Sequence, residues 1–123
     1  MIDGFIFRAD NKIFEEAIAK NLFGEQEYYL PLVKEIQPGT TIFLYNTQTQ
    51  KINGPFQAQG AGDKYLDPSA FSGMYPAQVR VKRTETIKSI DASELSEIIG
   101  FRGVFPDSEL DAQKLKKTLT LFK

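Results

Sequence analysis

The sequence predicts an α+β fold, in which helices cover a mostly antiparallel or mixed β-sheet that curls toward a barrel. A β-prone run at residues 4–8 leads into a helical pattern, several β-prone runs follow between residues 40 and 90, and helical patterns return near the end. The composition, 41% apolar and 25% charged, is that of an ordinary globular protein. At 123 residues the chain has room for one core, so we expect a single domain over residues 1–123.

The first predicted element is a strand that runs into a helix. Residues 4–8 (GFIFR) are rich in β-prone side chains, and Asp10 or Asn11 then offers an oxygen to the free amides at the start of a helix. We expect the helix to occupy residues 11–23 and to end at Gly24, because glycine tolerates the left-handed conformation common after a helix. The apolar residues that share one helical stripe are Phe14, Ala17, Ile18 and Leu22.

A β-hairpin is predicted for the middle of the chain. Residues 25–37 form an aromatic and aliphatic connector that should pack onto the core, and Pro38-Gly39 favours a turn. The strand at residues 40–46 is apolar on both faces, as expected of a central strand. Residues 51–60 should return beside it, and Gly54-Pro55 predicts a bulge or a sheet edge because proline cannot donate to a ladder.

The next predicted elements are a long loop and a strand. Residues 60–73 hold three glycines, one proline and two aspartates, and long loops often carry function. Apolar and polar residues then alternate over residues 75–82, which predicts a half-buried strand with a basic outer face. Residues 87–90 should extend this strand or pair with it.

Two helices are predicted to close the chain. Asp91 and Glu94 have the spacing of a capping box for a short helix that Gly100 ends. A last helix is expected to start near Ser108 and to dock on the sheet. Its apolar face would be formed by Leu115, Leu119 and Phe122.

The residue types present exclude several classes of enzyme. The chain has no histidine and no cysteine, which removes the commonest general base near neutral pH, the thiolate nucleophile and the usual zinc ligands. No serine lies in a G-x-S-x-G elbow, and no spacing singles out a pair of carboxylates. We therefore expect a protein that binds a partner and catalyses no reaction.

The sequence predicts neither a cofactor nor a metal. Gly60-Ala61-Gly62 is similar to the start of a dinucleotide fingerprint, but Tyr65 occupies the place of the third glycine and no helical pattern follows. Asp63 and Asp67 could bind calcium or magnesium, yet the other oxygen ligands are missing at loop spacing. We interpret both motifs as parts of a solvated loop.

The charge balance limits how a polyanion could bind. Lysine and arginine number 15 against 16 aspartates and glutamates, so no net positive field attracts nucleic acid. A local basic strip remains possible on one strand, and its alternative interpretation is a solvated strand face that binds nothing. The strip consists of Arg80, Lys82, Arg83 and Lys88.

A second set of residues combines amide groups with aromatic rings near the ends of predicted elements. A pocket that stacks a base or anchors a peptide needs this composition. Phe23 and Tyr45 could equally belong to the core. The set consists of Asn11, Phe23, Tyr45, Asn46 and Tyr75.

No membrane association is predicted. The apolar run within the first ten residues is too short for a signal peptide, and no apolar run approaches the roughly 20 residues that cross a bilayer. We expect a cytoplasmic protein, and the absence of cysteine fits a reducing compartment. The sequence does not indicate an oligomeric state.

Several short motifs follow one another along the chain: GFIF at 4–7, NK at 11–12, LFG at 22–24, PG at 38–39, IFLYN at 42–46, DPSAF at 67–71 and YPAQVRV at 75–81. In order and spacing, this set resembles the DCD (development and cell death) domain over nearly the whole chain. The chain departs from the plant pattern at Glu25-Gln26, where Leu-Pro is expected, at Phe71, where tryptophan is usual, and in lacking a cysteine near the end. These departures favour a stand-alone member and weaken the transfer of plant stress and cell-death roles.

The DCD domain is in turn similar to the PUA-like group, which includes EVE and YTH domains that take a modified base into an aromatic pocket. This resemblance implies a PUA-like curled mixed sheet, or pseudo-barrel, flanked by helices. Residues 20–23 (KNLF) resemble the end of the first YTH helix, with Phe23 in place of a pocket tryptophan. Arg8, Asp10 and Asn11 occupy the position after the first strand, so the resemblance implies that they also contact the ligand.

Two functions remain open at this point. In the first, Phe23, Tyr45 and Asn46 line a pocket for RNA or a modified nucleotide, and the basic strip contacts phosphates. In the second, the domain binds a protein partner through residues 28–32 or 71–75 as an apolar anchor. The absence of net positive charge argues only against binding driven by charge alone.

Overall fold

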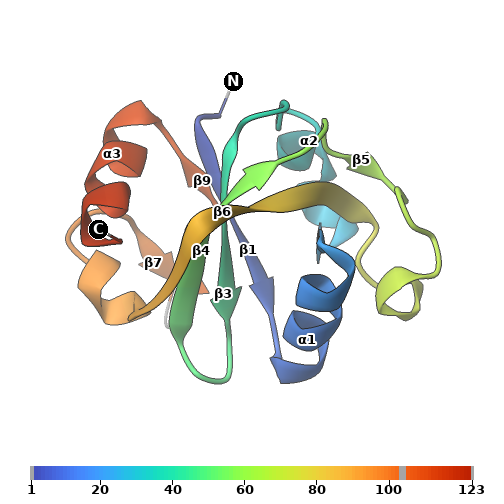
Figure 1. Ribbon diagram of the computed structural model, residues 1–123, viewed down its shortest axis with the longest axis horizontal. Coiled ribbons are helices and arrows are strands. Elements are labelled where there is room, and N and C mark those ends of the chain that lie inside the picture. The colour runs from blue at the N-terminus through green and yellow to red at the C-terminus, as the bar shows by residue number, and fades with distance from the viewer. Residues whose placement is uncertain (1, 103–104, 123) are drawn as a thin grey trace.

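The computed structural model describes residues 2–102 and 105–122, with the backbone alone at residues 85–86, 102 and 105. One curled seven-stranded sheet runs through the molecule, with α1 and α2 on one side and α3 on the other (Figure 1). The elements are β1 (Gly4–Ala9), α1 (Asn11–Lys20), β2 (Leu22–Glu25), η1 (Glu27–Tyr29), α2 (Leu30–Val33), β3 (Thr41–Asn46), β4 (Lys51–Ala58), β5 (Asp63–Lys64), η2 (Ala70–Gly73), β6 (Ala77–Asp91), η3 (Ala92–Leu95), β7 (Phe101–Arg102), β8 (Phe105–Pro106), β9 (Glu109–Leu110) and α3 (Ala112–Leu121).

The sheet is mixed, which is one of the two alternatives that the sequence leaves open and the one that the resemblance implies. Its strand order is β2-β6-β4-β3-β1-β9, and β5 pairs with β6. β1 and β3 are parallel, while the other pairs are antiparallel. The long strand β6 bends, so that its first part pairs with β2 and its second part pairs with β4. This bend brings β2 back toward β1, and the two strands contact each other without forming a ladder.

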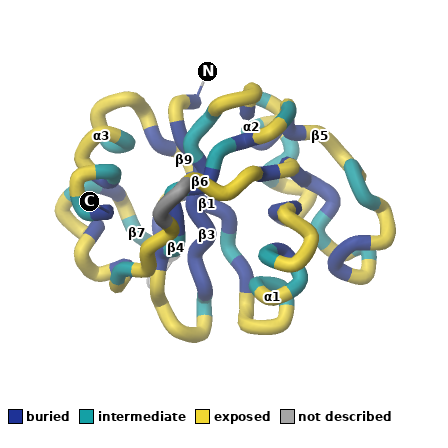
Figure 2. Tube along the Cα trace, viewed as in Figure 1, coloured by how far each residue is buried: buried dark blue, intermediate teal, exposed yellow. Residues whose placement is uncertain are grey.

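Each side of the sheet has its own apolar cluster. Phe5 and Phe7 of β1 point into the larger cluster, beneath α1 and α2, whereas Ile6 between them points into the smaller cluster beneath α3. This alternation follows from the period of two along a strand. Figure 2 shows the buried centre as a band of dark blue along β1 and β3, with exposed yellow segments around the rim. Within the described residues, no helix is long and apolar enough to cross a membrane.

The predicted strands and the central hairpin are confirmed. β1, β3 and β4 lie where the sequence places them, and the predicted alternating strand continues through residues 87–90 as part of β6. β4 carries a bulge between Gly54 and Phe56, and it lies between β3 and β6, so the bulge and not the sheet edge is the correct alternative. Asp10 caps α1, because its Oδ1 accepts a hydrogen bond of 2.9 Å from the Ile13 amide.

The predicted end of the first helix is wrong. α1 ends at Lys20, and Asn21 takes the left-handed conformation (φ 51°) that we expected of Gly24. Leu22 and Phe23 then form a buried strand with Gly24 and Glu25, paired with β6. Leu22 fits the helical stripe of α1 equally well, so periodicity could not distinguish the last helical turn from a short strand.

The last two predicted helices differ from the structure, the first in its cap and length and the second in its start. Asp91 forms no capping hydrogen bond, and a short 3₁₀ turn takes the place of the predicted helix. α3 begins at Ala112, where the Lys114 amide donates to Oδ1 of Asp111. Ser108 lies instead beside β1, with its carbonyl accepting a hydrogen bond of 2.7 Å from the Ile6 amide. Because the segment around Ser108 pairs with β1, α3 begins only at Ala112.

The long loop after β5 is fixed onto β2 by Phe71. The Phe71 ring covers Gly24, where a Cβ atom would lie 2.8 Å from the ring, so only glycine permits this close approach. Phe71 and Ser72 both have left-handed backbones, with φ values of 56° and 53°. The Glu16 carboxylate of α1 accepts a hydrogen bond of 2.7 Å from the Phe71 amide and anchors the loop.

Candidate nucleic-acid interface

The basic strip lies exposed along β6. Its four residues, Arg80, Lys82, Arg83 and Lys88, are all exposed to solvent. Two of the guanidinium groups are held by backbone carbonyls, since Arg80 donates to Leu66 at 3.3 Å and Arg83 donates to Ile18 at 3.5 Å. A carbonyl satisfies one donor without neutralising the charge, and neither guanidinium forms an ion pair with another described side chain, so both can still bind phosphate.

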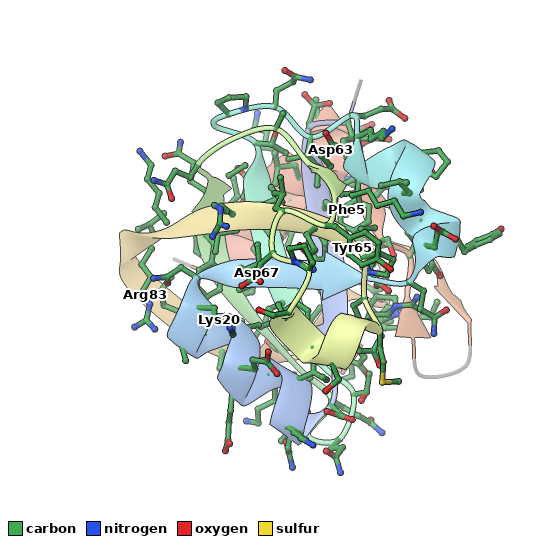
Figure 3. All side chains as sticks on the ribbon, turned by 90° about the vertical axis from the view of Figure 1, so that its right-hand side faces the viewer. Phe5, Lys20, Asp63, Tyr65, Asp67 and Arg83 are labelled. Atoms are coloured by element: carbon green, nitrogen blue, oxygen red, sulfur yellow. The ribbon has the colours of Figure 1, made fainter. Side chains whose placement is uncertain are left out.

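Lys20 extends the basic strip toward α1. It is the last residue of the helix, and Figure 3 shows its side chain on the same face as Arg83. Its Nζ lies 3.6 Å from Oδ2 of Asp67, an exposed contact of the kind that contributes little to stability. Hydrogen bonds from Ser69 lower the pKa of Asp67, so this carboxylate stays charged beside the cations. The sequence gives no sign that Lys20 joins the basic strip, because the fold alone brings α1 to β6.

Tyr65 supplies an exposed aromatic ring next to the basic strip. Its side chain is 42% exposed, and its neighbour Leu66 provides the carbonyl that holds Arg80. The Tyr65 amide donates to the Pro76 carbonyl at 2.8 Å, which fixes the residue beside β6. Sequence reasoning passed over Tyr65 as a loop residue, although an aromatic ring in a glycine-rich loop was the signal that could have identified it.

The structure does not form the predicted aromatic pocket. Phe23 is fully buried and packs edge-on against Phe7 and Phe56, with ring centroids 6.0 and 4.9 Å apart. Tyr45 is also fully buried, but it belongs to the cluster on the other side of the sheet. The two rings therefore cannot face one ligand, and the interpretation of both as core residues is the correct one. Burial of large aromatic surface on a curled sheet drives this outcome.

The predicted amide and carboxylate residues support a turn. Nδ2 of Asn46 donates to Oδ1 of Asn11 at 2.9 Å, and Oδ1 of Asn46 accepts from the amides of Gln48 and Thr49. Asp10 caps α1 from the same end of the sheet. These contacts fix the turn between β3 and β4 against the start of α1. Tyr75, the remaining member of the predicted set, is half-buried and packs edge-on against Phe71, with ring centroids 6.1 Å apart.

Arg8 forms an ion pair that bridges the seam between β1 and β2. Its Nε donates to Glu25 at 2.9 Å, and its guanidinium lies 4.7 Å from the centroid of the Tyr29 ring. The Glu25 side chain is only 3% exposed, and this burial raises its pKa although hydrogen bonds from Arg8 oppose the shift. Burial lowers the pKa of Arg8, but the hydrogen bond and charge of Glu25 outweigh it and hold that pKa above its ordinary value.

Arg8 also lies in the wall of a cleft of about 700 Å³. η1 and α2 form one side of this cleft, and the segment from Pro106 to α3 forms the other. The lining residues are Arg8, Tyr28, Tyr29, Leu32, Pro106, Asp107, Ser108, Glu109, Leu110, Asp111 and Lys114. Figure 3 shows Lys20 and Arg83 near one edge of the molecule and the cyan segment of η1 and α2 at the opposite edge. The cleft and the basic strip are therefore separate surfaces, and Arg8 does not join the other predicted ligand residues.

The described side chains offer no metal centre, since no three carboxylates converge within residues 2–102 and 105–122, and the sequence has no histidine or cysteine. The basic strip offers positive charge beside an aromatic ring that can stack. The cleft offers tyrosines beside carboxylates. Both arrangements are suited to binding.

Comparison with known sequences identifies one family. The model of the development and cell death domain matches residues 3–122. A DCD domain-containing protein of Glycine max, NRP-B, is 33% identical over 105 residues, which cover 80% of this chain and 32% of that protein. The B2 protein of Daucus carota is 30% identical over 105 residues, which cover 80% of this chain and 51% of that protein. The chain thus spans only a third to a half of these relatives.

Comparison with solved structures confirms the PUA-like α+β fold. The YTH domain of mmi1 in complex with RNA has a TM-score of 0.71 and 17% identity, over 97% of this chain and 80% of that one. The YTH domain of Zygosaccharomyces rouxii MRB1, in complex with N6-methyladenosine RNA, has a TM-score of 0.70 and 18% identity, over 98% and 86%. An ASCH protein of Zymomonas mobilis has a TM-score of 0.64 and 15% identity, over the whole of both chains.

Proposed function

We propose that this chain, which belongs to the development and cell death domain family, is a non-catalytic module that binds single-stranded RNA along β6. The observation that carries the proposal is the exposed basic strip, to which the fold adds Lys20. Support comes from the solved YTH domains of the same fold that are complexed with RNA. Phosphate contacts give such an interface its affinity and its orientation.

A base would stack on Tyr65, and not on the buried rings of Phe23 or Tyr45. The Tyr65 ring is exposed within reach of the loop that holds Arg80, so a nucleotide could place its phosphate on the strip and its base on the ring. Stacking of one base on an aromatic side chain contributes about 1–3 kcal/mol. A modified base would be distinguished by how well its enlarged apolar face covers this ring.

The test is the fluorescence anisotropy of a labelled single-stranded RNA titrated with the domain over a range of salt concentrations. Arg80→Gln with Lys82→Gln, two residues whose side chains lie on the same face of β6, should weaken binding and flatten its salt dependence. Each lost phosphate contact on a single strand changes the slope of log K against log salt by about 0.7, so the double variant should lose about 1.4. Tyr65→Ala should weaken binding with little change in that slope.

The matched control is Lys116→Gln with Lys117→Gln, which removes the same charge from exposed positions on α3. It should leave the slope nearly unchanged. Equal losses in the two double variants would mean that RNA responds only to net charge, and the proposed interface would then be wrong. Absence of any salt-dependent binding by the unmodified domain would reject the function itself.

A further inference from the structure

The cleft beside η1 differs from the basic strip in the sign of its charge. Arg8 is neutralised within the wall by its ion pair with Glu25. The opposite wall includes two exposed acidic residues, Asp107 and Glu109, and neither forms an ion pair with another described residue. Lys114 is the remaining cation among the lining residues. A phosphate would therefore be repelled from this cleft, and a cation would be attracted.

The cleft also exposes an aromatic ring, that of Tyr28. Tyr28 is 82% exposed and contacts Tyr29 edge-on, with ring centroids 5.1 Å apart. Arg8 already occupies one side of the Tyr29 ring, at 4.7 Å from its centroid. The Arg8 guanidinium is thus held between a tyrosine ring and a carboxylate within the wall. Tyr28 offers a second tyrosine ring beside it, on which another guanidinium could stack.

We infer that this cleft binds an arginine side chain of a partner protein, with the guanidinium stacked on Tyr28 and paired with Glu109 and Asp107. Charge complementarity selects the occupant, because the wall combines aromatic rings with an excess of carboxylates. Arginine fits better than lysine, since its planar guanidinium both stacks on a ring and donates to two carboxylate oxygens. At about 700 Å³ the cleft also has room for the neighbouring peptide backbone. The inference concerns a different surface from the RNA interface and does not rest on it.

The test is an amide NMR titration of the labelled domain with a blocked Gly-Arg-Gly peptide, compared with blocked Gly-Glu-Gly. The arginine peptide should produce saturable shifts at the amides of Tyr28, Tyr29 and Glu109, and the glutamate peptide should not. The isosteric double variant Asp107→Asn with Glu109→Gln should weaken arginine binding by at least about fivefold, since both charge partners are lost. Tyr28→Ala should weaken it similarly.

The matched control is Glu15→Gln with Glu94→Gln, which removes the same charge from exposed positions outside the cleft. Its affinity for the arginine peptide should equal that of the unmodified domain. The inference is overturned if the arginine peptide causes no saturable shift, if both peptides shift the same amides equally, or if the control loses as much affinity as the cleft variant. Saturable shifts of these amides by single-stranded RNA would also overturn it, because the cleft would then belong to a nucleic-acid site.

Discussion

The basic strip and the cleft combine charged groups with aromatic rings in opposite ways. On the basic strip, cations of β6 gather beside one exposed ring, whereas in the cleft carboxylates gather beside two tyrosines. The net charge of −1 gives no indication of either surface, because the positive charges of the basic strip and the negative charges of the cleft cancel in the sum. Charge balance over a whole chain therefore excludes only binding driven by net charge. Which partner a surface attracts depends on how the fold distributes that charge.

The largest expected effect is that of Phe23→Ala in β2. This strand pairs with β6, which carries the basic strip, and its Glu25 contacts Arg8 in the wall of the cleft. Phe23 is fully buried against Phe7 and Phe56, so its truncation should cost about 3–5 kcal/mol of the free energy of unfolding. Urea denaturation measures this loss, and exposed Tyr65→Ala serves as the control, with a change within about 0.5 kcal/mol. A stable Phe23→Ala protein that had lost RNA binding would restore this ring as a ligand contact.

A smaller effect distinguishes the ion pairs of the molecule. The Glu25 side chain is only 3% exposed, and Glu25→Ala leaves the Arg8 guanidinium beside it without its main partner. This variant should lose about 3 kcal/mol of the free energy of unfolding. Asp91→Asn removes the surface pair with Lys51 (3.8 Å) and should change the same quantity by less than about 0.5 kcal/mol. Urea denaturation of both variants checks this. Equal losses would mean that the seam ion pair contributes no more than a surface contact.

The smallest expected effect is the response of the free energy of unfolding to pH. Its sign should differ between Glu25, at the seam beside the cleft, and Asp67, beside the basic strip. Because burial raises the pKa of Glu25, the folded state binds a proton before the unfolded state does. Stability should therefore rise as the pH falls from neutrality toward 4.5, the ordinary pKa of this carboxyl. The lowered pKa of Asp67 has the opposite consequence, since the stability that it contributes is lost as the pH falls below 3.8.

Urea midpoints measured across this range test both signs. Glu25→Gln should remove the rise on mild acidification, and Asp67→Asn should reduce the loss at stronger acidity. A rise that persists in Glu25→Gln would assign it to another group and would contradict the burial argument.

Much of the sheet could be predicted because its strands carry a local signal. The apolar residues of β3 continue through both faces of the strand, which indicates a central position. Gly54-Pro55 marks the bulge in β4, and Asp10 marks the start of α1. Each of these signals depends on the conformational preferences of a few adjacent residues, so the sequence expresses them directly.

The end of α1 and the proposed pocket could not be predicted in the same way. Leu22 and Phe23 fit a helical stripe and a buried strand equally well, and pairing with β6 decides for the strand. The amide groups of Asn11 and Asn46 suit a ligand pocket by composition, yet here they bond to each other and to a turn. A list of suitable residue types does not state which of them face one another.

The residues alone were enough to predict the α+β class and a basic strip on one strand. These follow from periodicity and from cations placed along one strand, which need no contact between distant segments. The cleft and the buried position of Glu25 arise from packing between distant segments. In the sequence, Glu25 looks like an ordinary surface residue. Its position is set by the bend of β6, which returns β2 to β1 and brings the carboxylate to Arg8. Such long-range contacts depend on packing across the whole chain, so they cannot be predicted from the preferences of adjacent residues.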